Sequence, residues 1–400
     1  MKSTLAQCWI NKKTTIQFLP TAPGCYRFLD FAILCRTVFL SLCMGLLLSS
    51  CATRKVAPLV PKQDLRSVWS TDLGGEVNYP ASVAQANGRM ATATSSGTVS
   101  VLNVVNGAVV WKIKIKGVVT AGVGFDGERV AVMTDNNDLV VMQEGKVIWQ
   151  HNLGAQSFTA PLVAGLRVFA LLADRSVVAF DGMSGQKLWT QQKTGDALVV
   201  KQDGVLAAFN NTLLAGFGGK LAGLDSLTGK ILWEATLANP RGINDLERLV
   251  DLVGPLARVR DVVCARAFQA QVGCVDASVG KIIWTRPSFG EEGISAQGNQ
   301  LVTIESNGEI LSWSVNNGER LWDRSAFKGH HLTAPLVSDK GIFIGDSVGW
   351  VYLLSKDDGS VLNRMPIGST RGFASPPTWV DNQHMVMVTK SGLVTQYFTP

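Results

Sequence analysis

The sequence predicts an all-β fold, an eight-bladed β-propeller whose blades are four-stranded antiparallel sheets. The main observation is a glycine, three residues and a tryptophan, which returns about every 40 residues, the period of a propeller blade. The motif occurs as Gly107…Trp111, Gly145…Trp149, Gly185…Trp189, Gly229…Trp233, Gly280…Trp284 and Gly318…Trp322. A further copy, Gly359…Asn363, has lost its tryptophan.

Each repeat is expected to contain four short strands. The first often follows a proline, as at Pro80 and Pro161, where no ladder donor is needed. The second and third are short apolar runs around a tight turn, and the fourth follows the repeat glycine, as in Asn106-Gly107. The expected second strands include Val130–Met133, Val168–Leu172, Val262–Ala265, Gly341–Ile344 and Met385–Val388, and the third include Val99–Leu102, Leu139–Met142, Val177–Phe180, Leu221–Leu224, Ile310–Trp313 and Val351–Leu354.

The two ends of the repeat region predict how the ring closes. The last repeat, Met385 to Phe398, lacks a fourth strand, whereas Ser67–Ser70 is a lone fourth strand that carries Trp69. Pairing these two segments completes an eighth blade and removes the exposed sheet edges of an open array. We therefore expect residues 65–400 to form one closed propeller.

The repeat tryptophans are interpreted as packing elements between blades. One tryptophan per repeat at a fixed strand position buries a large area and needs a partner for its indole N–H. This structural set is Trp69, Trp111, Trp149, Trp189, Trp233, Trp284 and Trp322.

Residues 1–50 read as a signal peptide. Thr37 to Ser50 is uncharged and leucine-rich, follows Arg36, and is too short to span a bilayer. The run ends Leu48-Ser49-Ser50-Cys51, which resembles the bacterial lipobox, so Cys51 is the expected lipidation (palmitate) site and 51–64 the lipidated tether. The alternative is an ordinary signal peptide with a chance cysteine. The length of the leader leaves the true start codon open.

Charge and cysteine usage limit the function of the body. The leader carries +4 of the net charge of +6, so residues 51–400 are nearly neutral at +2 and have no footprint for nucleic acid. Two cysteines, Cys264 and Cys274, remain after Cys51. A cross-strand disulfide is one alternative, and two small buried thiols are the favoured one.

No catalytic, metal or cofactor site emerges from the sequence. Residues 216–220 read Gly-Phe-Gly-Gly-Lys, but they lack the spacing of a phosphate loop and fit a hairpin turn. His330 and His331 have no third ligand nearby and are expected in a polar loop between blades.

The motif Ala179-Phe180-Asp181…Gly185…Trp189 resembles the repeat of the quinoprotein-alcohol-dehydrogenase-like propellers. Together with the lipobox and the tryptophan of the first strand, it resembles the BamB family of outer-membrane assembly lipoproteins over about residues 51–400. The resemblance implies a non-enzymatic scaffold of the β-barrel assembly machinery, lipid-anchored to the cell outer membrane and facing the periplasm. It also implies docking on the POTRA domains of the central barrel protein BamA, contact with other subunits of that complex, and no cofactor.

The resemblance places the partner contacts in two connections between blades. In the first, Leu198, Val200 and Lys201 match the family in type, although the family has arginine where Lys201 stands. In the second, Asp251 matches the first of two family aspartates, whereas Val253 replaces the second.

The residues themselves favour the same region. Asn239–Arg258 lengthens the widest interval between repeat tryptophans, and long loops on a rigid scaffold concentrate function. We expect it to be an exposed loop presenting Leu246, Leu249, Leu252 and Leu256 beside the first connection. A surface loop without a partner is the alternative.

Three further hypotheses stay open. The chain could be a periplasmic quinone-dependent dehydrogenase, although no Cys-Cys pair is present and little length remains beyond the blades. It could be a lipoprotein scaffold of another envelope complex. Its strand edges could also hold unfolded outer-membrane barrel clients by strand addition.

Overall fold

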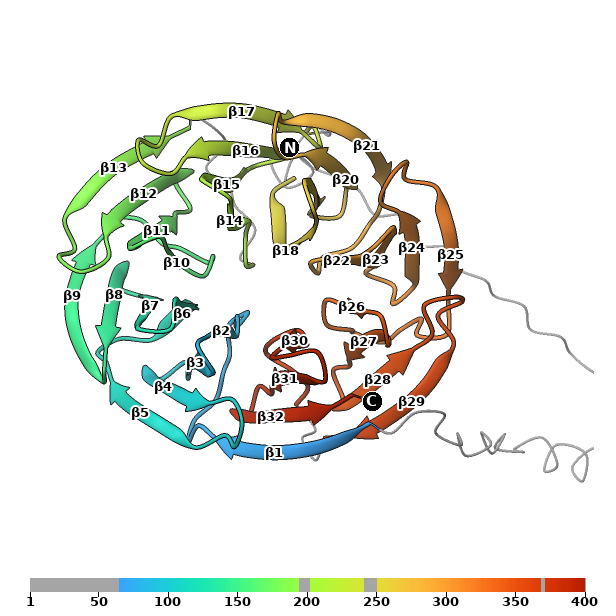
Figure 1. Cartoon of the computed structure of the whole chain (residues 1–400), viewed down its shortest axis with the longest axis horizontal. Coiled ribbons are helices and arrows are strands. Elements are labelled where there is room, and N and C mark those ends of the chain that lie inside the picture. Colours follow the sequence, from blue (N-terminus) through green and yellow to red (C-terminus); the bar gives the residue numbers. More distant parts are fainter. Residues whose placement is uncertain (1–64, 194–201, 241–249, 368–370, 400) are drawn as a thin grey trace, which may run out of the picture. The chain divides into compact units, whose positions relative to one another are not determined.

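The computed structural model describes residues 65–193, 202–240, 250–367 and 371–399. Within these ranges the chain forms eight four-stranded antiparallel sheets arranged as a ring (Figure 1). The described residues contain no helix, and hence none long and apolar enough to cross a membrane. The prediction of an eight-bladed β-propeller is confirmed.

Seven blades are built from consecutive strands. They are β2–β5 (Ala84–Ala86, Arg89–Ala93, Thr98–Asn103, Val109–Lys114), β6–β9 (Val119–Phe125, Arg129–Thr134, Asp138–Gln143, Lys146–Asn152), β10–β13 (Leu162–Ala164, Arg167–Leu171, Ser176–Asp181, Lys187–Gln192), β14–β17 (Leu206–Phe209, Thr212–Phe217, Lys220–Asp225, Ile231–Thr236), β18–β21 (Leu252–Val259, Val262–Ala267, Gln271–Asp276, Lys281–Pro287), β22–β25 (Ser295–Gln297, Gln300–Ile304, Ile310–Ser314, Arg320–Arg324) and β26–β29 (Leu336–Ser338, Gly341–Gly345, Trp350–Leu354, Val361–Pro366). We number these blades 1 to 7 in chain order.

Blade 8 joins the two ends of the ring. It consists of β30 (Thr378–Trp379), β31 (His384–Val388) and β32 (Leu393–Phe398), completed by β1 (Arg66–Asp72) as its outer strand. The register of β1 against β32 runs from Arg66 opposite Phe398 to Asp72 opposite Leu393. In Figure 1 the blue strand therefore lies beside the red one, and the predicted closure is confirmed.

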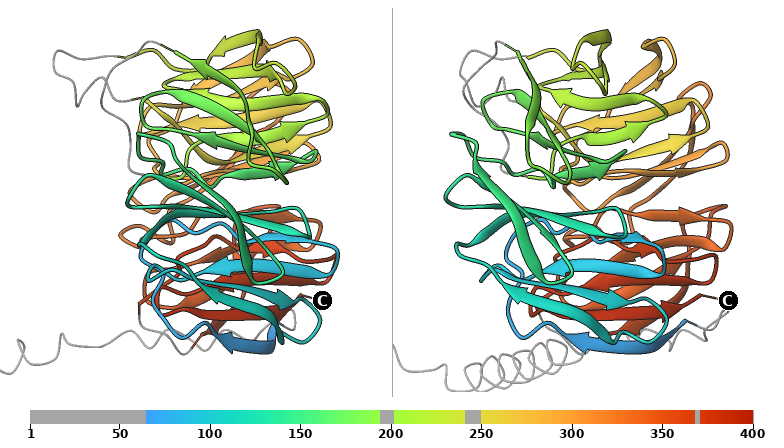
Figure 2. Two further views of the ribbon diagram at one scale, coloured as in Figure 1. Left: turned by 90° about the vertical axis from the view of Figure 1, so that its left-hand side faces the viewer. Right: turned by 60° about the vertical axis from the view of Figure 1, so that its left-hand side comes forward.

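The burial of each strand follows its place in the blade. The second and third strands are almost wholly buried, as in β7, because both of their faces lie against neighbouring blades. The fourth strand forms the outer wall and alternates between exposed and half-buried residues, as in β5 and β13. Figure 2 views the ring from the side, where successive blades lie face against face.

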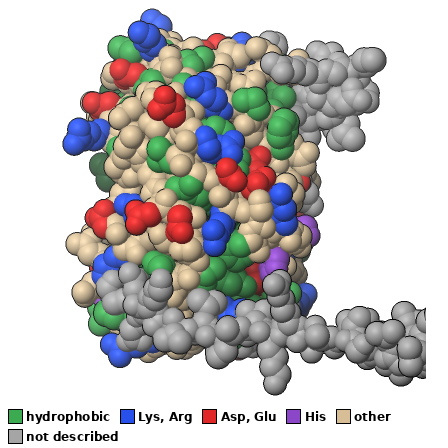
Figure 3. All heavy atoms as spheres, turned by 90° about the vertical axis from the view of Figure 1, so that its right-hand side faces the viewer, with side chains coloured by type: hydrophobic (Ala, Val, Ile, Leu, Met, Phe, Trp, Pro, Cys, Tyr) green, Lys and Arg blue, Asp and Glu red, His purple; other side chains and the backbone are tan. Residues whose placement is uncertain are grey.

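The outer wall has a mixed surface. Figure 3 shows basic and acidic side chains interspersed among hydrophobic ones on the side of the ring that lies at the right of Figure 1. Such a distribution produces no field of one sign on that side.

The repeat glycine and the repeat tryptophan meet across the boundary between blades. A Cβ atom on Gly318 of blade 6 would lie 2.5 Å from the ring of Trp284 in blade 5, and one on Gly229 would lie 2.5 Å from Trp189. The indole N–H usually donates to a backbone carbonyl of the same turn. These bonds join Trp69 to Val104, Trp149 to Gly182, Trp189 to Ser226, Trp284 to Val315 and Trp322 to Lys356.

The lost tryptophan of the last copy has a structural reason. Asn363 in β29 faces blade 8, whose third and fourth strands are the two ends of the chain rather than the arms of one hairpin. No glycine turn links β32 to β1, so a tryptophan in β29 would have no turn on which to pack. Asn363 is buried and instead accepts a hydrogen bond from the backbone N–H of Arg364.

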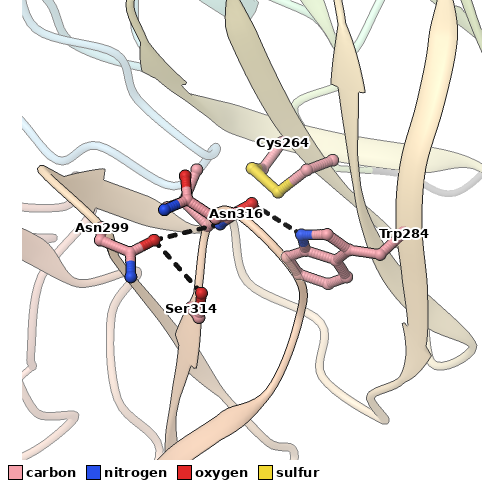
Figure 4. The surroundings of a disulfide bond; sticks show 7 residues. Cys264, Trp284, Asn299, Ser314 and Asn316 are labelled. Carbon is pink, nitrogen blue, oxygen red and sulfur yellow. Dashed lines mark hydrogen bonds between the residues drawn. A yellow bond between two sulfur atoms is a disulfide. The ribbon is translucent and has the colours of Figure 1, made fainter.

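Cys264 and Cys274 form a disulfide between directly opposed residues of β19 and β20. The expectation of two separate thiols was wrong. Both residues are buried, and Figure 4 shows the bond near Trp284 and the turn that follows β24, where Asn299 accepts hydrogen bonds from Ser314 and Asn316. Because disulfides persist in oxidising compartments, this bond fits an exported protein.

Candidate docking surface

Two connections between blades carry the predicted partner contacts. The first leads from β13 to β14 and the second from β17 to β18. Leu198, Val200 and Lys201 lie outside the described residues, as do Cys51 and the tether 51–64. The residues that flank the two connections are described, so the place where each connection leaves and rejoins the propeller is known.

The two connections rejoin the propeller side by side. Gly204, at the end of the first, forms an isolated antiparallel bridge with Val253, just after the end of the second. The N–H of Gly254 donates to the carbonyl of Asp203 at 2.8 Å. These backbone contacts hold the two ends together independently of any side chain.

Asp251 is the described member of the predicted contacts. Its carboxylate accepts a hydrogen bond from Nη1 of Arg175 at 2.9 Å, and only 13% of its side chain is exposed. Asp251 therefore stands at the base of the second connection as half of a largely buried ion pair. The start of the first connection is held as well, because Lys193 pairs with Glu234 of β17 at 2.5 Å.

The expected apolar patch on Asn239–Arg258 is partly wrong. Strand β18 begins at Leu252, so Leu252 and Leu256 belong to a blade rather than to a loop. Leu252 is buried and packs in the core of its blade, and Leu256 is half-buried. Leu246 and Leu249 lie outside the described residues.

A small hollow lies beside the ion pair. It has a volume of about 50 Å³ and is lined by Phe158, Thr159, Arg175, Gln202 and Asp251, among others. Blades 3, 4 and 5 all contribute to this lining. Thr159 also accepts a hydrogen bond from the N–H of Gly204 at 3.0 Å, which ties the end of the first connection to blade 3.

The axis of the ring contains a larger cavity of about 690 Å³. Its ionisable lining is mostly acidic. Burial raises the pKa of Asp203 to about 6, against hydrogen bonds from Ala160 N–H and the Ser82 hydroxyl. Glu292 reaches solvent inside the cavity, yet the surrounding protein raises its pKa to about 7, with the charge of Glu291 adding to the rise. Asp346, Lys390, His331 and Tyr79 complete the ionisable lining.

The cavity offers an anionic quinone one lysine, Lys390, beside the carboxyl groups of Asp203, Glu292 and Asp346. Binding of such a quinone would therefore depend on a bridging cation. Among the described residues, no group of three His, Cys, Asp or Glu side chains is arranged to hold a metal ion. His330 lies 3.8 Å from Asp346, which lines the cavity together with His331.

The sequence reasoning missed Arg175 and Asp203. Both owe their roles to contacts between residues distant in the sequence, 76 residues apart for Arg175 and Asp251. A signal for Arg175 was nevertheless present, because it occupies a turn position that other repeats give to glycine.

Comparisons with known proteins agree with this architecture. The family described as "Outer membrane protein assembly factor BamB" matches residues 95–324. A protein of that name from Burkholderia pseudomallei is 28% identical over 359 residues, 87% of this chain and 94% of the relative. The crystal structure of BamB from Moraxella catarrhalis has a TM-score of 0.76 at 22% identity, covering 84% of this chain and all of that one.

The fold is also shared with enzymes. A quinohemoprotein alcohol dehydrogenase from Pseudomonas putida has a TM-score of 0.67 at 13% identity, covering 85% of this chain and 77% of the enzyme. That likeness concerns the fold alone. The family match, by contrast, covers more than half of the 400 residues. The chain therefore belongs to the outer membrane protein assembly factor BamB family.

Proposed function

We propose that this protein is a non-enzymatic scaffold of the β-barrel assembly machinery that docks on the POTRA domains of BamA. The observation that carries the proposal is the convergence of the two connections, joined by the Gly204–Val253 bridge and flanked by the Arg175–Asp251 pair. On this proposal the two closely rooted connections together supply the contacts with the partner. Its proposed contacts are Leu198, Val200, Lys201 and Asp251.

The proposed location is the periplasmic face of the outer membrane. Cys51 would carry the lipid, and residues 51–64 would link it to the propeller. The buried Cys264–Cys274 disulfide supports an oxidising compartment.

The alternative of a quinone-dependent dehydrogenase is less well supported, because the likeness to such enzymes concerns the fold alone, whereas the family match is to the BamB family. The alternative of a scaffold for another envelope complex differs only in the partner, so the experiment must identify the partner.

The test is co-purification of BamA from detergent-solubilised membranes with the full-length chain. The variant carries Leu198→Ala, Lys201→Glu and Asp251→Asn, where asparagine keeps the shape of the residue beside Arg175. The control carries the same kinds of change on exposed residues far from the connections, Leu227→Ala, Lys281→Glu and Asp357→Asn. Thermal melts check folding.

We expect BamA to co-purify with the wild type and with the control. Little BamA should co-purify with the variant, whose own melting temperature should be unchanged. Equal recovery with the variant would mean that another face docks. Recovery of a different envelope complex by the wild type would move the function to that complex.

A further inference from the structure

The turn between the second and third strands has a common design in six blades. Its last residue donates its N–H to a carbonyl three residues earlier and has a positive φ. That residue is Gly97, Asn137, Arg175, Gly308, Gly349 and Gly392 in blades 1, 2, 3, 6, 7 and 8. Arginine is thus placed where the other blades use glycine or asparagine.

Arg175 pays a conformational cost at this position. Its φ is +62°, a left-handed conformation that Cβ-bearing residues other than asparagine and aspartate seldom adopt. The turn itself needs no arginine, since glycine makes the same backbone hydrogen bond in four blades. Glu144, Leu166, Arg260 and Gln269 also have positive φ, so the conformation alone assigns Arg175 no role, and its contacts must show one.

The side chain of Arg175 spans three blades. It starts in blade 3 and reaches Asp251, which directly precedes the first strand of blade 5. Between them lies the turn of blade 4, where a Cβ atom on Gly218 would stand 3.3 Å from Nη1 of Arg175 and 3.9 Å from the Asp251 carboxylate. Because Gly218 has no side chain, the turn of blade 4 leaves room for the guanidinium of Arg175 to reach Asp251.

The backbone carbonyl of Arg175 accepts a hydrogen bond from the N–H of Lys193, where the first connection begins. The carbonyls of Gly97 and Asn137 accept the equivalent bond in blades 1 and 2, so this contact belongs to the turn and would survive replacement of Arg175. The guanidinium of Arg175 holds Asp251, where the second connection ends, and both partners of this pair are nearly buried at 12% and 13% exposure. The side chain of Arg175 therefore fixes the end of the second connection, beside the start of the first.

We propose that Arg175 is a positioning residue of the docking surface, whose side chain holds Asp251 in the arrangement that the partner binds. This inference rests on the proposed function. Fixing groups before association reduces the entropy lost on binding, so the effect is on affinity rather than on the fold. Arg175 need not touch the partner.

The test replaces Arg175 by the residues that its own repeats use. Full-length Arg175→Gly and Arg175→Asn are purified in detergent, and their affinity for detergent-solubilised BamA is measured by biolayer interferometry beside thermal melts. Asn137→Gly is the matched control, because it places glycine at the corresponding turn position of blade 2. We expect Kd to rise about tenfold for both Arg175 variants and to stay unchanged for the control. The melting temperatures should stay near that of the wild type, because relief of the backbone strain at residue 175 offsets the loss of the ion pair, and removal of the long side chain opens the Asp251 carboxylate to water.

A double-mutant cycle with Asp251→Ala separates positioning from general loosening. If Arg175 acts through Asp251, adding Arg175→Gly to Asp251→Ala weakens binding much less than it does in the wild type. Wild-type affinity in both Arg175 variants would overturn the inference and leave the docking proposal intact. Lower melting temperatures in both would make Arg175 a structural residue and also overturn it. Failure of the wild type to bind BamA would overturn the proposed function and this inference together.

Discussion

Trp284 donates its indole N–H to the carbonyl of Val315 at 2.7 Å and covers Gly318 in the same turn of the next blade. The glycine and tryptophan of one motif thus belong to two different contacts. The glycine receives the tryptophan of the preceding blade, and the tryptophan reaches the glycine of the following one. The motif is therefore a property of neighbouring blades rather than of one blade.

A pair of glycine substitutions tests this contact. Gly318 and Gly88 have nearly equal φ values of +69° and +70°, but an added Cβ meets the Trp284 ring at Gly318 and nothing within 4 Å at Gly88. We expect Gly88→Ala to cost about 1 kcal/mol from backbone strain and Gly318→Ala to cost about 1–3 kcal/mol more from overpacking. Thermal melts measure both, and equal losses would show that conformation alone selects glycine in this motif.

The repeat made the fold predictable, because a local pattern with a fixed period encodes both the blade and its neighbours. Even the closure followed from the sequence, since Ser67–Ser70 and Met385–Phe398 supply complementary parts of one blade. The Cys264–Cys274 bond was not predictable in the same way. The two residues could be placed on adjacent strands, but their direct opposition depends on register, which the spacing alone does not specify.

The disulfide is expected to stabilise the propeller. Replacing both cysteines by alanine should lower the free energy of unfolding by about 2–3 kcal/mol, because the bond closes a loop with a sequence separation of 10. Since both residues are buried, a reductant should break the bond only when the protein is unfolded. Peptide mapping by mass spectrometry checks the bond before and after denaturation. Two free thiols in the untreated protein would contradict this prediction.

A buried ion pair links blades 5 and 6. Arg266, in β19, is wholly buried and donates to Glu305 at 3.1 Å and to Ser288 at 2.9 Å. Arg266→Met should destabilise the protein by about 3–5 kcal/mol, because it leaves the Glu305 charge buried without its partner. Adding Glu305→Gln removes that charge and should recover part of the loss in a thermal melt. A double variant no more stable than Arg266→Met would assign the cost to packing instead.

The axial cavity predicts a pH dependence of stability. Burial raises the pKa of Asp203 from its usual 3.8 to about 6, so folding favours the protonated carboxyl. The free energy of unfolding that this bound proton contributes is fully present below about pH 4 and is lost as the pH rises through about 6. The difference in melting temperature between Asp203→Asn and the wild type should therefore shift in favour of the variant as the pH rises over this range. For Glu292→Gln the same shift is expected between about pH 4.5 and 7. Parallel curves would show that neither carboxyl titrates differently on folding.

The candidate site was less predictable than the fold, for reasons visible in Leu252 and Arg175. Leu252 follows a charged segment and suggested an exposed loop, but it is the buried first residue of strand β18, whose start the charge pattern did not mark. Arg175 of blade 3 reaches Asp251, beside blade 5, across the turn of blade 4. Such contacts depend on the angle between blades, which is a property of the closed ring.

The pairing of β1 with β32 joins strands from opposite ends of the chain. Strand β1 is synthesised early but can pair only after β32 has been made. Until then the blades form an open arc whose two terminal strand edges are unpaired. Those ends resemble the exposed strand edges that aggregate most readily. A chain truncated before Leu393 should stay open whatever the state of its other blades, which makes ring closure a check that the whole polypeptide has arrived.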